Sequence, residues 1–339
     1  PPRSTLFPYT TLFRSGKMAR CESNLGMAPL GALGVKGKTG WRPGAAVGII
    51  GGQGEMGRLF ARFFADKGYT VHVADIGTEL SGKDVVARSE VVLFAVPLHQ
   101  SVSIIGDLVP HTRPEQLLLD VSSLKTRPVQ EMLRSEASVV GLHPMFGGRI
   151  GTFAGQTLVA CPVRVQENDW RGLRELFASA GILVKETSPE EHDRMMSIIQ
   201  VLFHMTTMLT GRVLRELNVD IAETLHYTSP SYRLEINLIG RMFAQSPALY
   251  SAITQMNPYT GELLVLLKNG LDAYEEWFRK EDLGAFIADF ERSAQHLGSF
   301  CGGAYEESSA FLDWIVRVSQ SDGRSAWNGA DPRPVVEDE

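Results

Sequence analysis

The sequence is short of cysteine, of positive charge and of long apolar runs. Its 339 residues include only three cysteines, which lie far apart with no CxxC pair, so neither a disulfide framework nor a metal site is predicted. The formal net charge of −6 argues against nucleic-acid binding, which depends on a basic surface. No apolar run approaches the roughly 18 residues of a membrane span, and no cleavable signal sequence is recognisable. These absences favour a cytoplasmic protein with neither membrane nor nucleic acid as partner.

What is present is enough apolar material to build folded domains. The hydrophobic fraction of 44% and charged fraction of 21% are typical of globular proteins, and the length predicts about two domains. Residues 1–15 resemble translated adaptor DNA, because RSTLF returns nearly mirrored as TLFRS. With the Gly- and Lys-rich stretch that follows, residues 1–44 are interpreted as an adaptor-like and flexible leader. Residues 320–339 have little to bury and are predicted to be a disordered tail.

Residues 45–187 alternate between predicted strands and helices. The first strand is short and continuously apolar, as is typical of a strand buried on both faces, and apolar residues at helical spacing follow it. Repetition of strand and helix predicts a parallel sheet wound with helices, which is a Rossmann-type α/β domain. The predicted strands are 45–50, 70–75, 91–96, 117–121, 139–142, 156–161 and 182–185, with a helix at 169–180.

From residue 188 the strand signals stop. The segment 190–217 carries an apolar stripe at helical spacing and predicts one long helix. Further helices are predicted at 231–245 and 258–279, with at least one more in 283–318. Residues 188–319 are therefore predicted to form an all-α domain.

The segment GQGEMG at 52–57 fits the GxGxxG fingerprint of dinucleotide-binding loops. A lone match is weak, but here a buried strand precedes the loop and an amphipathic helix follows it, so that a pyrophosphate can approach the helix N-terminus. Asp75 ends the second strand, where an acid can bond the ribose 2′-hydroxyl and repel a 2′-phosphate. This pattern predicts NAD rather than NADP as cofactor. The predicted cofactor site comprises Gly52, Gly54, Glu55, Met56, Gly57 and Asp75.

Polar residues follow two later strands, at the edge where a Rossmann sheet binds its ligands. The motif DVSSLK at 120–125 contributes Ser123, and GLHPMFGG at 141–148 contributes His143. A neutral imidazole there can take a proton from a substrate hydroxyl as hydride departs to the nicotinamide, and Ser123 can share that hydrogen bond. A lone histidine at a strand end is more often structural. The prediction that His143 and Ser123 are catalytic therefore depends on the two occurring together.

Arg233, Asn237 and Arg241 recur at four-residue spacing and form a polar stripe on an otherwise apolar predicted helix. One of the arginines can clamp a substrate carboxylate through a bidentate pair. A salt bridge to Glu235 or Glu191 explains the same pattern equally well.

Taken together, the motifs GGQGEMGRLF, DVSSLK, GLHPMFGG, EHDRMM and SPSYRLEINLIGRMFAQ resemble the prephenate dehydrogenase family of tyrosine biosynthesis. The resemblance is strongest to the dehydrogenase part of the bifunctional chorismate mutase/prephenate dehydrogenases, and it runs in matching order from about Ala45 to Val318. It implies NAD-dependent oxidative decarboxylation of prephenate to 4-hydroxyphenylpyruvate. It also implies a homodimer that pairs through the helical domain.

The resemblance further implies roles for single residues. His143 matches the histidine that accepts a hydrogen bond from the ring 4-hydroxyl, and Ser123 matches the serine that bonds both the same hydroxyl and the histidine. Arg241 matches the arginine that binds prephenate's carboxylate, and Arg233 matches a second arginine near it. His204 matches a histidine close to the substrate and inhibitor region.

Alternatives remain open at this point. Arogenate dehydrogenase, or a cyclohexadienyl dehydrogenase that accepts both substrates, would use the same chemistry. A reductase of the β-hydroxyacid or 6-phosphogluconate type usually relies on a lysine in the long helix, and 190–217 has none. A non-catalytic NAD-binding regulatory module would have no need of Ser123 and His143. Residues 1–44 are too few for an upstream mutase domain, so we expect a monofunctional dehydrogenase unless the adaptor-like start replaced a lost N-terminus. Asn237 departs from the apolar or small residue expected in relatives.

Overall fold

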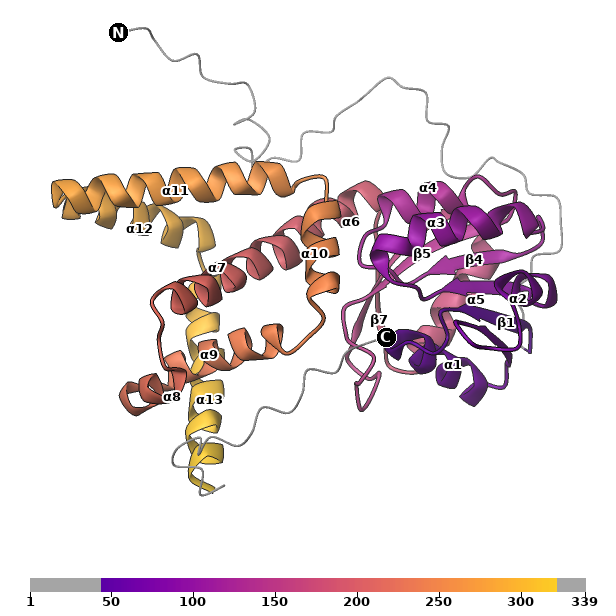
Figure 1. The fold of residues 1–339 in the computed structure, drawn as a ribbon, viewed down its shortest axis with the longest axis horizontal. Coiled ribbons are helices and arrows are strands. Elements are labelled where there is room, and N and C mark those ends of the chain that lie inside the picture. Colours follow the sequence, from indigo (N-terminus) through magenta and orange to yellow (C-terminus); the bar gives the residue numbers. More distant parts are fainter. Residues whose placement is uncertain (1–43, 322–339) are drawn as a thin grey trace, which may run out of the picture. The chain divides into compact units, whose positions relative to one another are not determined.

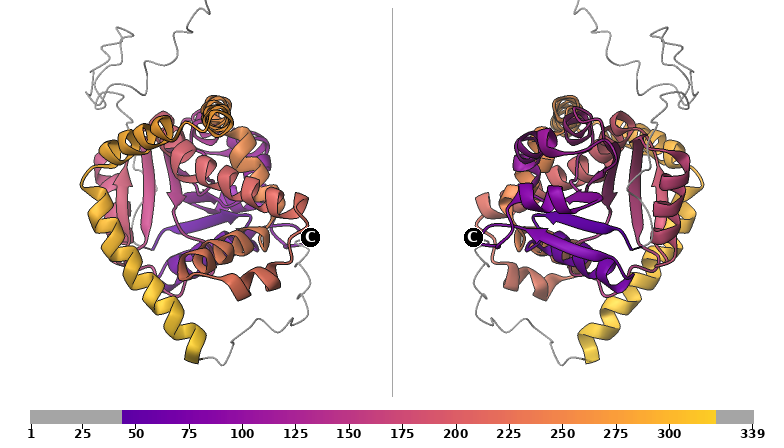
Figure 2. Two further views of the ribbon diagram at one scale, coloured as in Figure 1. Left: turned by 90° about the vertical axis from the view of Figure 1, so that its left-hand side faces the viewer. Right: turned by 90° about the vertical axis from the view of Figure 1, so that its right-hand side faces the viewer.

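The computed structural model describes residues 44–321. The predicted leader up to residue 43 and the predicted tail beyond residue 321 lie outside the described residues. Figures 1 and 2 show that the strands belong to the indigo-to-rose part of the chain, and that the part from α6 onward is helical.

A seven-stranded sheet has the order β2-β1-β3-β4-β5-β6-β7. The pairs β2–β1, β1–β3, β3–β4 and β4–β5 are all parallel. The chain order reverses at β1, which lies between β2 and β3, and ligands of open α/β sheets bind outside the strand ends at such a switch point. The strands are β1 (Ala46–Ile50), β2 (Thr70–Ala74), β3 (Val91–Phe94), β4 (Leu117–Asp120), β5 (Ser138–Pro144), β6 (Thr157–Arg164) and β7 (Leu183–Glu186).

Helices cover both faces of the sheet and bury a core against each. One core joins the strands to the aromatic faces of α1 (Glu55–Asp66) and α5 (Glu167–Ala178). The other joins them to α2 (Gly82–Arg88), α3 (Leu98–Leu108) and α4 (Thr126–Met132). Figure 1 shows α3 and α4 on one side of the strands and α1 on the other. The predicted Rossmann-type fold is confirmed.

The far edge of the sheet differs from the prediction of a parallel sheet. β6 runs antiparallel to β5, and β7 is parallel to β6, so these two strands are reversed relative to β1–β5. The reason is the connection, because a loop without a helix follows β5. A parallel neighbour needs a crossover connection, which is usually a helix, whereas a direct loop returns the chain antiparallel.

The rest of the described chain is helical, as predicted. The segment predicted as one long helix is interrupted: α6 (Pro189–Met196) passes into a π-helical segment at Ser197–Leu202 and then into α7 (Phe203–Glu216). The region predicted to hold at least one more helix contains two, which separate at Gly298 with φ of 57°. The remaining helices are α8 (Ile221–Thr224), α9 (Pro230–Phe243), α10 (Pro247–Met256), α11 (Thr260–Lys280), α12 (Leu283–Leu297) and α13 (Phe300–Ser321), with short 3₁₀ turns at Val109–His111 and Leu225–Tyr227.

The helical part leaves much of its apolar surface uncovered. Several large apolar side chains of α11, α12 and α13 are 60% or more exposed, among them Phe278, Phe290, Phe300, Tyr305 and Trp314. A monomer rarely exposes so much apolar surface without a binding partner for it. No helix within residues 44–321 is long and apolar enough to cross a membrane.

Candidate active site

The glycine-rich loop joins β1 to the N-terminus of α1. Its glycines differ in what surrounds them. A Cβ on Gly57 would lie 2.2 Å from the carbonyl oxygen of Gly51, and one on Gly52 would lie 2.3 Å from Val73 Cγ1. A Cβ on Gly54 would have no heavy atom nearer than 3.5 Å. Gly52 and Gly57 are therefore required by the fold itself, whereas the space above Gly54 is open.

The first turn of α1 offers its backbone N–H groups to that open space. Gly54 is the N-cap residue, and within the described chain no side chain caps this turn. Unpaired N–H groups at a helix N-terminus attract phosphate. Glu55 in this turn forms an ion pair with Arg149, and Met56 packs against the core. The loop and α1 thus fit the pyrophosphate of a dinucleotide.

Asp75 lies directly beyond β2 and contacts the same loop. Its carboxylate accepts hydrogen bonds from the backbone N–H groups of Gln53 and Ile76, both at 2.7 Å. This places a carboxylate beside the glycine loop, as the prediction requires. Ile76, which the sequence analysis did not single out, is 93% exposed next to it.

His143 is buried near the end of β5, with a relative exposure of 3%. Its Nδ1 lies 2.8 Å from Nε2 of His192 in α6, and Nδ1 of His192 lies 2.8 Å from Oδ1 of Asp193. Burial, assisted by the neighbouring His192 and Lys125, holds the pKa of His143 well below its usual range. His143 is therefore neutral near pH 7 and able to accept a proton, whichever of its nitrogens is free.

The two residues behind His143 were missed by the sequence analysis. Burial lowers the pKa of His192 as well. Burial alone would raise the pKa of Asp193, but hydrogen bonds from His192, Thr126 and Lys125 outweigh it and keep the pKa of Asp193 below its ordinary value. Within residues 44–321 no three His, Cys, Asp or Glu side chains are grouped so as to hold a metal ion.

A second network fixes the strand ends around His143. The ammonium group of Lys125 is fully buried, pairs with Asp120 at the end of β4, and donates to the carbonyl oxygen of Leu142 at 2.7 Å. Its own backbone N–H donates to Asp193 Oδ1 at 2.7 Å. Lys125 therefore ties β4, β5 and α6 together at the residue that precedes His143.

Ser123 lies between these residues in the same loop and is half-buried. Its hydroxyl makes no hydrogen bond to another described residue, whereas the neighbouring Ser122 bonds Asp120 and the carbonyl oxygen of Leu124. The loop after β4 thus uses one serine structurally and leaves the other available. No direct hydrogen bond joins Ser123 to His143 in the described chain.

Gln200 approaches His143 from the other side. It belongs to the π-helical segment, and its Nε2 lies 3.4 Å from Nε2 of His143. Its amide oxygen is buried and has no partner among the described residues. π-helical turns are often found at functional sites because they alter which side chains a helix presents. Gln200, like His192 and Asp193, is a residue that sequence periodicity could not identify.

Two of the predicted substrate residues of the helical part, His204 and Arg241, lie near the same tyrosine. His204 in α7 packs edge-on against Tyr250 with ring centroids 4.8 Å apart. Burial raises the pKa of Tyr250, and the positive charge of Arg241 opposes this shift. Nδ1 of His204 is buried without a described partner. Arg233 is half-buried and Arg241 exposed, and neither forms an ion pair with a described residue. Glu191, one predicted partner, pairs with Arg194 instead.

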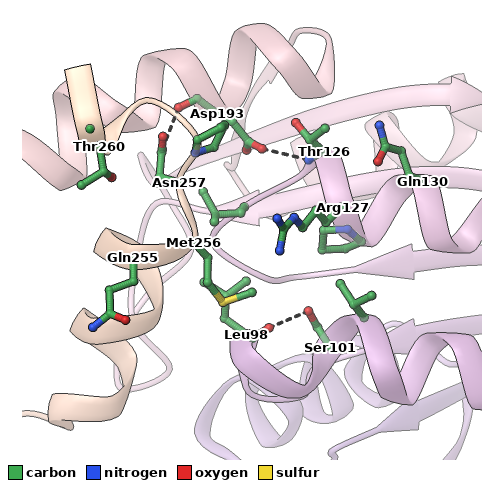
Figure 3. Close-up of a pocket in the computed structure, with 15 residues that line it drawn as sticks. Leu98, Ser101, Thr126, Arg127, Gln130, Asp193, Gln255, Met256, Asn257 and Thr260 are labelled. Atoms are coloured by element: carbon green, nitrogen blue, oxygen red, sulfur yellow. Dashed lines mark hydrogen bonds between the residues drawn. The ribbon is translucent and has the colours of Figure 1, made fainter. Parts of the chain in front are cut away.

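A cavity of about 580 Å³ lies beside Asp193, between α3–α4 and α10–α11. Figure 3 shows Asp193 bonded to Thr126 on one side and, through its backbone carbonyl, to Asn257 on the other. Arg127 and Met256 also line the cavity. None of the sequence-predicted site residues lines it, so this cavity is distinct from the edge that carries the glycine loop and His143.

The fold and these residues define a class. A glycine loop at a helix N-terminus, an acid after the second strand and a neutral buried histidine near the end of β5, followed by a helical domain, are the parts of a dinucleotide-dependent dehydrogenase.

Comparison with known proteins identifies the family. Residues 62–182 match the family model described as prephenate dehydrogenase, nucleotide-binding domain, and residues 188–292 match prephenate dehydrogenase, dimerization domain. The T-protein of Enterobacter agglomerans is 36% identical over 78% of this chain and 70% of that protein. The chain belongs to the prephenate/arogenate dehydrogenase family.

Two further relatives extend the comparison. A probable arogenate/prephenate dehydrogenase of Methanocaldococcus jannaschii is 31% identical over 78% of this chain, which spans 64% of the length of that protein. The crystal structure of prephenate dehydrogenase from Aquifex aeolicus, in complex with hydroxyphenyl propionate and NAD⁺, matches 75% of this chain and 98% of that one, with a TM-score of 0.59 and 17% identity. This likeness confirms the fold.

Proposed function

We propose that the chain is an NAD-dependent prephenate dehydrogenase, which oxidatively decarboxylates prephenate to 4-hydroxyphenylpyruvate. The observation that carries this proposal is the buried, neutral His143 near the end of β5, in a sheet whose switch point holds the dinucleotide loop. Membership of the family supplies the substrate class.

NAD, when bound, supplies the acceptor for the hydride that leaves the substrate. The open space above Gly54 and the uncapped first turn of α1 fit its pyrophosphate. The Asp75 carboxylate fits a ribose 2′-hydroxyl and would repel a 2′-phosphate, which favours NAD over NADP. The exposed side chain of Ile76 offers an apolar surface to the adenine ring.

The ring hydroxyl of prephenate is the group that His143 acts on. His143 accepts the hydroxyl proton as hydride leaves the same carbon, so that the C–O bond becomes a carbonyl. Loss of CO₂ from the ring carboxylate then returns an electron pair to the ring, which becomes aromatic. His143 gives the proton back to the phenolic oxygen, and no net proton is released. Ser123, whose hydroxyl is available, aligns the substrate hydroxyl.

The carboxylate of the substrate requires a cation, and Arg241 is the best candidate. It has no acidic partner within residues 44–321, and its charge lies close enough to Tyr250, which packs against His204, to oppose the rise that burial causes in the pKa of that tyrosine. We assign substrate binding to Arg241, with His204 and Arg233 as further candidates in the same helical part. A bidentate arginine–carboxylate pair would position the dianion against the nicotinamide.

Arogenate is the second candidate substrate, because the relative from M. jannaschii carries both names. It differs from prephenate in bearing an amino group in place of the side-chain keto group, and His143 would act on it in the same way.

We also propose that two copies pair through the helical part. The exposed apolar side chains of α11–α13 need a cover, and the matching family model is described as a dimerization domain. Sedimentation of the purified protein at twice the monomer mass tests this.

The test of function measures NADH formation from NAD with prephenate and with arogenate in parallel. Turnover with prephenate is expected, His143→Asn should lower kcat about 10²–10⁴-fold with little change in KM, and Arg241→Ala should mainly raise KM. Arg171→Ala, an exposed arginine of α5, is the control. If both site variants changed kcat and KM to the same extent, this assignment of roles would be contradicted. Turnover with arogenate alone would keep the mechanism and identify arogenate as the substrate.

A further inference from the structure

We propose that His192 and Asp193 are positioning residues that hold His143 in one tautomer, with its proton on Nδ1 and with Nε2 as the proton acceptor. The kinetic part of this inference rests on the proposed function, whereas the tautomer itself does not.

Asp193 determines which atoms donate and which accept in the hydrogen bonds that lead to His143. Its Oδ1 accepts from the backbone N–H of Lys125 at 2.7 Å, and its Oδ2 accepts from the backbone N–H of Thr126 at 3.0 Å. Backbone amides can only donate, so both carboxylate oxygens are acceptors. The bond of 2.8 Å between Asp193 Oδ1 and His192 Nδ1 therefore has its proton on His192.

The position of the proton on His192 in turn determines its position on His143. A neutral His192 with its proton on Nδ1 has a bare Nε2, which can only accept. The contact of 2.8 Å between this Nε2 and His143 Nδ1 therefore has its proton on His143, and Nε2 of His143 is left bare. The opposite tautomer would set two lone pairs against each other at this distance.

Gln200 lies on the other side of the ring. Its amide group is 3.4 Å from His143 Nε2, and its amide oxygen has no partner among the described residues. Through its nitrogen this amide donates to a bare Nε2, which agrees with the tautomer set by Asp193 and His192, whereas through its oxygen it would accept from an Nε2–H group. The position of the proton on His143 therefore follows from Asp193 and His192.

The same hydrogen bonds stabilise the positive charge that His143 acquires when it takes up a proton. When Nε2 takes up a proton, the Nδ1–H group still donates to His192, whose acceptor nitrogen is made more basic by the ionised Asp193. The other charged group that acts on His143 is Lys125 from the loop after β4, and Asp120 from β4 and Cys161 from β6 interact in turn with Lys125. Lys125 is paired with Asp120, and burial raises the pKa of Cys161 to about 12, so that this thiol stays neutral.

The hydrogen bonds that run from Asp193 through His192 to His143 form a relay, and two variants break it at different points. Asp193→Asn replaces an acceptor with a donor and should invert or mix the tautomers of both histidines. Because Asp193 also holds the amides of Lys125 and Thr126, this variant can lose stability. His192→Gln keeps the backbone amide contacts of Asp193, and it removes the fixed acceptor for His143 together with the N–H group that donates to Asp193. Glu190→Gln is the matched control, since it removes one charge from the exposed face of the same helix.

The first readout is the ¹⁵N spectrum of histidine-labelled protein without cofactor or substrate, with His143→Asn to assign the signals. The wild type and Glu190→Gln should show a protonated Nδ1 and a bare Nε2 at His143, and both relay variants should lose this pattern. A wild-type His143 with its proton on Nε2 would overturn the proposal, as would an unchanged pattern in His192→Gln.

The second readout is kinetic and covers the pH profile. Both relay variants should lose about 10²-fold or more in kcat across the profile, with KM and NAD affinity changed less than about threefold, because only the orientation of the base is affected. An unchanged kcat in His192→Gln would overturn the relay. If wild-type protein turns over neither substrate while the ¹⁵N pattern responds as expected, the proposed function fails and the tautomer assignment stands.

Discussion

Replacing Gly57 by alanine should destabilise the fold through a clash that the structure defines. The added Cβ would lie 2.2 Å from the carbonyl oxygen of Gly51 and 2.6 Å from Cα of Gly52, where ordinary contacts begin near 3.4 Å. Both obstacles are backbone atoms of the turn between β1 and α1, so no side chain can swing away. Overpacking of this kind costs about 1–3 kcal/mol, and an overlap of this depth belongs at the upper end. Alanine regains about 1 kcal/mol as a better helix former. The expected net loss is about 2 kcal/mol.

The matched variant is Gly54→Ala, which should separate folding from binding. Gly54 has φ −65° and ψ 164°, which alanine adopts freely, and its Cβ would meet nothing nearer than 3.5 Å. We expect its free energy of unfolding to stay within about 0.5 kcal/mol of the wild type. Its methyl group would instead occupy the space proposed for the pyrophosphate, so the dissociation constant for NAD should rise about tenfold or more.

Urea denaturation and NAD titration of the three proteins test both statements. Equal destabilisation by Gly54→Ala and Gly57→Ala would refute the distinction drawn from the two environments. Unimpaired NAD binding by a folded Gly54→Ala variant would refute the placement of the cofactor.

Stability should depend on pH through the buried histidines. Burial lowers the pKa of His143 and of His192, so below about pH 6.5 the unfolded chain binds protons that the folded chain does not, and the free energy of unfolding should fall by up to about 2.7 kcal/mol per pH unit. Denaturation at pH 5–8 measures this, and a slope unchanged in His143→Asn would contradict it. Lys125→Met should cost about 3–5 kcal/mol, because it leaves the Asp120 carboxylate buried without its cation, and Asp120→Asn added to it should recover part of the loss in the same assay. Asp75→Ala should lower the ratio of NAD to NADP affinity about tenfold or more, and an unchanged ratio would show that another group selects the cofactor.

The parts of the fold that could be predicted from the sequence are those that local pattern determines. The buried strand β1, the glycine loop and the amphipathic α1 follow one another within a short stretch, so composition and spacing identify all three. The direction of β6 depends on how the chain returns after β5, and strand propensity carries no information on direction. The π-helical segment could not be predicted either, because a continuous apolar stripe predicts a helix without distinguishing α-helical from π-helical turns.

His143 could be proposed as the base from its position near a strand end, but the residues that support it could not. His192 lies 49 residues further along the chain and reaches His143 only through the folding of α6 against the sheet. The motif EHDRMM contained both relay residues, yet three adjacent polar residues at a helix start are typical of capping and solvation. Ser123 was found through its motif, and the bond expected between it and His143 is absent among the described residues.

Asp193 explains why both halves of the chain are needed for this site. Its side chain holds the loop that follows β4, through the amides of Lys125 and Thr126, and it orients His192 toward His143. Its backbone carbonyl accepts from Asn257 at the end of α10, at 2.9 Å. One residue thus connects the strand ends that carry the base with the helices that carry the proposed substrate contacts. A shift of α10 relative to the sheet would reach His143 through these bonds, so the geometry of the base depends on how the helical part packs.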